Sequence, residues 1–78
     1  MATIHTVGSI NIVVFFNEHG APHFHAFGPD SSAKIAIDDN ATVMAGNLSC
    51  AHYRAVKRWA IANQDLLMKH WNEITRGT

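Results

Sequence analysis

Residues 10–16 read Ile-Asn-Ile-Val-Val-Phe-Phe, and this stretch decides the fold class. Its β-branched and aromatic side chains favour an extended strand. From Ile12 onward the stretch is apolar on both faces, whereas helices packed on a sheet cover only one of them. We therefore expect the second face to meet another surface, and a second copy of the chain fits that need. The stretch thus predicts a strand in a homodimer.

Four shorter extended segments surround this strand, each bounded by turn-forming residues such as glycine, proline, aspartate and asparagine. They cover residues 3–7, 23–27, 33–38 and 42–45. Short turns join antiparallel neighbours, whereas parallel strands need long crossovers. The sequence therefore predicts a small antiparallel sheet of three to five strands over residues 1–48.

The first of two expected helices runs from Cys50 to about Ala62, with Ser49 as its N-cap. At about 100° per residue, one broad face is apolar and the opposite face is basic. The basic side chains are Arg54, Lys57 and Arg58. The predicted apolar face comprises Ala51, Tyr53, Ala55, Val56, Trp59, Ala60 and Ala62.

The second helix follows a break at Asn63-Gln64 and ends near Gly77. Asp65 in its first turn suits the positive end of the helix dipole. Its predicted apolar side comprises Leu66, Leu67, Met68, Trp71 and Ile74. Together the segments predict one α+β domain over residues 1–78, in which two C-terminal helices (residues 49–78) pack on one face of the sheet.

Length and composition narrow the possibilities further. The chain has 78 residues, 47% of them hydrophobic, which argues against disorder. Cys50 is the only cysteine, so self-association, a metal or unaided packing must stabilise so small a core. No apolar run is long enough to span a membrane, and no secretion leader is recognised. We therefore expect a cytoplasmic protein.

Three of the six histidines lie within seven positions. His23 and His25 are two apart on an expected strand, so their side chains point to the same face, roughly 7 Å apart at Cβ. His19 precedes Gly20, which allows the loop to fold back toward them. Three imidazoles suit zinc, and nickel or copper accept the same ligands. A divalent-metal site at His19, His23 and His25 is therefore one hypothesis.

Two other roles for these histidines stay open. Imidazoles beside a proline–glycine turn can be structural, donating to a carbonyl or accepting from an amide. Alternatively, His19 and His25 pass protons without a metal, as in a small ribonuclease. That reaction needs a cation for the phosphate, and the place of Arg54 and Lys57 on the face opposite the core disfavours it.

The charges are unevenly spread along the chain. Residues 1–48 carry one cation and four carboxylates, whereas residues 49–78 carry five cations and two carboxylates. The stripe of Arg54, Lys57 and Arg58 is the candidate contact for a partner. Three cations without interleaved aromatic residues support nucleic-acid binding only weakly, and an acidic protein fits them equally well.

Residues 17–26, Asn-Glu-His-Gly-Ala-Pro-His-Phe-His-Ala, resemble the signature of a bacterial family known only as a domain of unknown function, DUF4160. Its members show Asn-Asp/Glu-His, then a proline and a His-x-His pair. The strand at residues 34–38 and the helical Trp59, Asp65 and Trp71 are similar to the family pattern. The resemblance implies this fold over nearly the whole chain. Genes of the family often lie beside a second small domain, in pairs that look like toxin–antitoxin modules.

The leading hypothesis from these observations is a non-enzymatic interaction module, one half of such a gene pair, with a small cognate protein as its partner. The alternative is a metal-binding protein that uses His19, His23 and His25, either structurally or in the hydrolysis of RNA. The two differ in whether function requires an ion.

Overall fold

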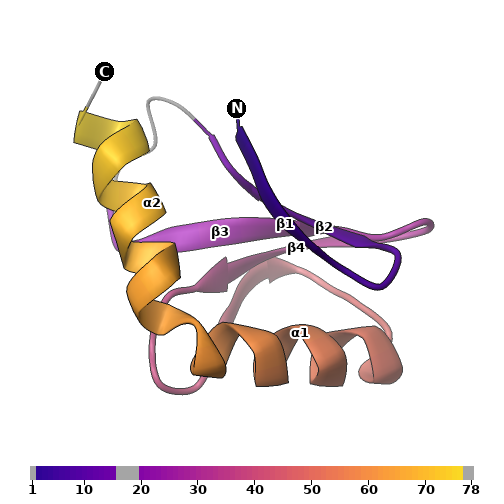
Figure 1. The fold of residues 1–78 in the computed structure, drawn as a ribbon. Helices are drawn as coiled ribbons and strands as arrows, with labels where there is room; N and C mark the ends of the chain where they lie inside the picture. Colours follow the sequence, from indigo (N-terminus) through magenta and orange to yellow (C-terminus); the bar gives the residue numbers. More distant parts are fainter. Residues whose placement is uncertain (1, 16–19, 77–78) are drawn as a thin grey trace.

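The computed structural model describes residues 2–15 and 20–76 of the chain, and in them five strands precede two helices (Figure 1). All neighbouring strands pair antiparallel, in the order β1-β2-β3-β4-β5. This architecture confirms the predicted α+β class. The elements are β1 (Ala2–Val7), β2 (Ile10–Val14), β3 (His23–Phe27), β4 (Ser32–Ala36), β5 (Val43–Gly46), α1 (Cys50–Ala62) and α2 (Gln64–Arg76).

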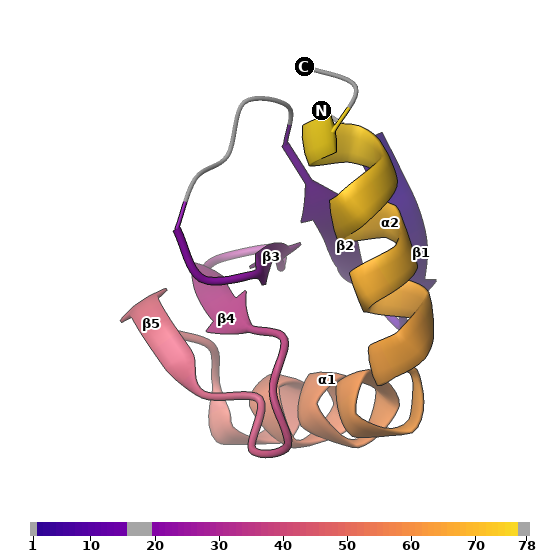
Figure 2. The ribbon, with the colours of Figure 1, turned by 90° about the vertical axis from the view of Figure 1, so that its left-hand side faces the viewer.

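The two helices cover the sheet in different places. α1 runs below the strands and contacts β1, and α2 turns away from it and rises beside β2 and β3 (Figures 1 and 2). The turn lies at Asn63, as predicted, where its side-chain amide donates to the carbonyl of Trp59 at 2.8 Å. At the other end of α1, the Ser49 hydroxyl accepts the His52 amide at 3.3 Å, which confirms the predicted N-cap.

The hydrophobic core fills the space between the sheet and both helices. β2, β3 and β4 each contribute alternate side chains to it, as a sheet with one packed face requires. Its largest fully buried apolar side chains are Phe24, Ile10, Ile12, Ile35, Leu67, Val14 and Val56. Trp71, on α2, is buried in the same cluster, so its predicted core role is confirmed.

We predicted a homodimer because the helices were expected to leave the second apolar face of β2 uncovered. The structure shows that part of this face is covered within the single chain. Val13 lies between two core residues in sequence and pairs with His25 on β3. It is only 3% exposed in the single chain. The chain therefore already covers this residue without a second copy, while Phe16 lies outside the described residues. The homodimer stays a prediction, but Val13 no longer supports it.

The rotation of α1 about its own axis differs from the prediction, so that it buries a narrower face than expected. Its fully buried side chains are Val56 and Ala60, whereas three alanines assigned to the apolar face are exposed. The apolar arc is wider than the sheet can cover, because a straight helix presents only one side to a single layer. The exposed alanines are Ala51, Ala55 and Ala62.

α2 shows a smaller difference of the same kind. Leu67 and Trp71, one turn apart, define its buried face. Leu66 points about 100° away from Leu67 and is 38% exposed rather than packed with the core. Neither helix, within the described residues, is long and apolar enough to cross a membrane.

Candidate functional site

The central strand β3 carries the histidine pair. His23 is 1% exposed and His25 is half-buried. Their ring centroids lie 5.3 Å apart with an angle of 74° between the ring planes. The two imidazoles therefore share one face of the strand, as their spacing predicted. His19 lies outside the described residues, so its predicted place beside them is not described.

The ring of His23 is oriented by the backbone just before the strand. Its Nδ1 lies 2.9 Å from the carbonyl oxygen of Ala21. Because a carbonyl only accepts, Nδ1 carries the proton in this hydrogen bond, and in the neutral ring Nε2 then carries the lone pair. A backbone carbonyl that fixes the tautomer in this way is common behind metal-ligating histidines, and it is equally suited to a structural one.

Aromatic rings surround both imidazoles. The indole of Trp71 lies 5.0 Å from the His23 ring, and the ring of Phe15 meets His25 edge-on at 4.6 Å. Phe27, two residues along β3, stacks nearly parallel to His25 at 6.1 Å. The two imidazoles therefore belong to one row of rings. The row runs from Trp71 on α2 through the histidine pair to the exposed Phe27 on β3. Sequence spacing gave no signal of the contact between His23 and Trp71.

The described residues alone supply too few side chains to hold a metal ion. Within residues 2–15 and 20–76, no group of three or more His, Cys, Asp or Glu side chains is placed to hold a metal ion. His23 and His25 supply two imidazoles that fit such a group. The third predicted ligand, His19, and the neighbouring Glu18 belong to the residues that are not described.

Lys34 and Asp38 differ in their relation to the histidine face. Lys34 pairs with His25 across β3 and β4, and both line a shallow hollow of about 230 Å³. Asp38 instead closes the turn before β5. Its carboxylate accepts the Asn40 amide at 2.9 Å and the Thr42 hydroxyl at 3.1 Å.

The environment of Asp38 also shifts its titration. Desolvation raises the pKa of the Asp38 carboxyl, but hydrogen bonds from Asn40 and Thr42 together outweigh it, and the net pKa shift is downward. The carboxylate is therefore held ionised by its own turn. It is a structural group of the β4–β5 connection rather than a partner of the histidines.

The basic stripe lies on another surface. Arg54, Lys57 and Arg58 are all exposed on α1, as predicted. Arg54 and Arg58 line a hollow of about 220 Å³ with Ala51 and Ala55, and none of these residues lines the hollow beside His25. This separation of the two hollows weakens the metal-free ribonuclease hypothesis, which needs a cation from the stripe at the histidines.

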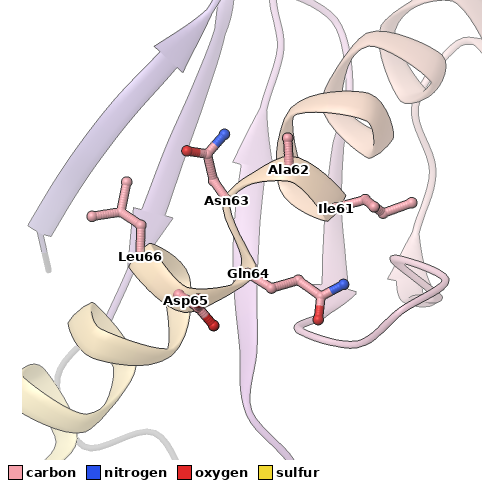
Figure 3. A pocket seen from close by; sticks show the side chains of 6 residues that line it. All are labelled: Ile61, Ala62, Asn63, Gln64, Asp65 and Leu66. Carbon is pink, nitrogen blue, oxygen red and sulfur yellow. The ribbon is translucent and has the colours of Figure 1, made fainter.

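A third hollow, of about 510 Å³, lies at the bend between the helices (Figure 3). Ile61 and Leu66 stand on its two sides, 41% and 38% exposed. Gln64 and Asp65 form its polar edge. The sequence pattern missed this hollow, because it placed Leu66 on the apolar side of its helix and gave Ile61 no role.

The fold and the site define a small α+β protein with a paired-histidine central strand and an uncovered helical surface. The family model described as "Domain of unknown function (DUF4160)" matches residues 10–72, so the chain belongs to this family. No curated protein and no solved structure matches the chain.

Proposed function

We propose that the protein is a non-enzymatic interaction module that binds a small cognate protein, as one half of a toxin–antitoxin-type gene pair. The observation that supports this proposal is apolar surface left open on the helices, where Ile61 and Leu66 flank the hollow at their bend. Exposed apolar side chains gathered around a hollow are characteristic of a protein-binding surface. The pairing with a neighbouring gene rests on the family pattern.

The contacts of the histidines favour the same proposal. His23 is buried against Trp71 and donates to a backbone carbonyl, which are the contacts of a structural residue. The cations of α1 line a different hollow from His25. These arrangements suit recognition by the helices better than acid–base chemistry on the sheet.

Titration calorimetry tests the proposal with two purified proteins, this chain and the product of the adjacent gene. The expected result is saturable binding that is unchanged by EDTA. Absence of binding at concentrations where both proteins are folded would overturn the proposal. Light scattering on the chain alone decides, in the same samples, whether it is the homodimer that we also propose.

The metal-binding alternative has one specific observation in its favour. The hydrogen bond from His23 Nδ1 to Ala21 leaves Nε2 as the basic nitrogen, beside a second imidazole on the same face. His19, His23 and His25 would hold a divalent ion such as zinc, and bound zinc supplies Lewis acidity for structural stabilisation or RNA hydrolysis.

The matching test measures zinc stoichiometry in the parent and in His25→Ala. His25 is the better choice because it is half-buried, whereas His23 is packed against Trp71. One zinc per chain in the parent and none in the variant would support the alternative. Equal zinc content in the two proteins would contradict it.

A further inference from the structure

Two hollows lie along the solvent-facing side of α1 and at its bend into α2, and we call the exposed apolar and basic residues that line them the α1 face. It lies opposite the buried Val56 and Ala60. On a helical wheel the exposed alanines fall within about 40° of each other, Arg54 and Arg58 lie beside them, and Ile61 follows on the far side of the arginines. The α1 face comprises Ala51, Arg54, Ala55, Arg58, Ile61, Ala62 and Leu66.

The central part of the α1 face, which we call its floor, consists of small apolar side chains. Ala51 and Ala55, one turn apart, floor the hollow of about 220 Å³ near the start of α1. Ile61, Ala62 and Leu66 line the hollow of about 510 Å³ at the bend (Figure 3). Small side chains along a helix allow a second helix to approach closely. A large apolar side chain of that second helix finds its place between Ile61 and Leu66.

The flank of the α1 face is cationic. Arg54 and Arg58 are one turn apart, both exposed, and no salt bridge joins either to a carboxylate of the described residues. Lys57 extends the same charge, with its Nζ 5.9 Å from the centroid of the Tyr53 ring. Carboxylates four residues apart on a facing helix match two arginines at this spacing.

We propose that the α1 face docks an amphipathic helix of an acidic partner protein. The partner helix lays small and apolar side chains along the alanine floor, inserts a large apolar one at the bend, and pairs two carboxylates with Arg54 and Arg58. This inference rests on the proposed function and deepens it, because it specifies the chemistry of the segment that the interaction module recognises.

Other occupants fit the α1 face less well. A second copy in a two-fold arrangement would bring Arg54, Lys57 and Arg58 of both chains together, and the carboxylate that lines the hollow at the bend is Asp65 alone. A nucleic-acid backbone would satisfy the arginines but leave Ile61 and Leu66 without apolar contacts. An acidic amphipathic helix satisfies the floor and the flank together.

The experiment uses two synthetic helical peptides of about 18 residues, five turns long. Both carry an alanine and leucine stripe. One has glutamates four residues apart on its flank, and the other has lysines at the same places. Each is titrated into the full ¹⁵N-labelled chain, and amide shifts are recorded. The glutamate peptide is expected to bind at least about tenfold more tightly, with shifts concentrated on the α1 face.

The double variant Arg54→Glu/Arg58→Glu is expected to reverse this preference, so that the lysine peptide binds more tightly. Lys69→Glu is the matched control, because Lys69 is an exposed cation on α2 outside the α1 face, and its preference should equal that of the parent. Circular dichroism checks that each variant is folded. Equal binding of the two peptides, shifts centred on the sheet, or an unchanged preference in the double variant would overturn the inference.

Failure of this inference is distinguishable from failure of the proposed function. If the cognate protein binds and the double variant binds it equally well, the α1 face is not the docking site but the interaction module stands. If the cognate protein does not bind while the glutamate peptide does, the α1 face is a docking site and the proposed gene-pair function fails.

Discussion

Tyr53 on α1 donates a hydrogen bond of 2.7 Å from its hydroxyl to the carbonyl oxygen of Ala41, in the turn before β5. Ala41 is fully buried and has a φ of 49°, in the left-handed region that residues other than glycine rarely adopt. The bond therefore ties the first helix to a strained turn. It holds the α1 face in a fixed position relative to the sheet.

Tyr53→Phe removes only this hydroxyl. We expect the free energy of unfolding to fall by about 0.5–1.5 kcal/mol, because the carbonyl of the buried Ala41 loses its donor while the packing of the ring remains. Urea unfolding measures the change. Lys57→Ala, which removes the cation near the same ring, is the control and should cost less. Equal loss in the two variants would show that the hydroxyl contributes nothing specific.

The two histidines should contribute unequally to the free energy of unfolding. His23→Ala is expected to destabilise the fold by about 1–3 kcal/mol, because it removes a buried, hydrogen-bonded ring that packs on Trp71. His25→Ala should cost clearly less, since His25 is only half-buried. Thermal and urea unfolding compare the two. A larger loss for His25→Ala would contradict the structural role assigned to His23.

Asp38 should contribute to the acid sensitivity of the fold. Its pKa in the folded protein lies below its usual value near 3.8, so its stabilising contribution is present above that value and is lost as pH falls through the lower, folded pKa. The free energy of unfolding of the parent should therefore fall on acidification below about pH 4. Asp38→Asn should show a flatter acid limb. Parallel profiles for the two proteins would disprove this account of the turn.

Gly46 ends β5 with a φ of 72°, and a Cβ built there would collide with the carbonyl oxygen of Ser32. Gly46→Ala should destabilise the fold by about 1–3 kcal/mol through backbone strain and this contact. Gly8→Ala is the matched control, because Gly8 also has a positive φ, of 59°, but open space around its Cβ. The difference between the variants isolates the collision, and equal losses would argue against it.

The strands and helices were predictable because each element follows a local rule. β-Branched and aromatic residues marked β2, turn-forming residues bounded β4, Ser49 capped α1, and the two-residue spacing put His23 and His25 on one face. These features depend on neighbours along the chain. The same rules predicted that α2 begins at Asp65, and in the structure it begins one residue earlier, at Gln64.

The rotation of the helices was not predictable in the same way. An apolar arc on α1 fits several orientations, and the choice depends on distant contacts such as the bond from Tyr53 to Ala41. That choice exposes Ala51 and Ala55 beside the arginines and so creates the α1 face. The contact of His23 with Trp71 likewise joins residues far apart in sequence, which no spacing rule foresees.

The central claim is that the protein works by binding a cognate protein without a metal ion. Native mass spectrometry of the chain co-expressed with the product of its adjacent gene tests this claim directly, because one spectrum resolves partner, ion and copy number. The account predicts a complex of the two proteins whose mass contains no metal and which persists in EDTA. A chain that carries zinc and no partner, or a complex that dissociates when the ion is removed, would contradict it.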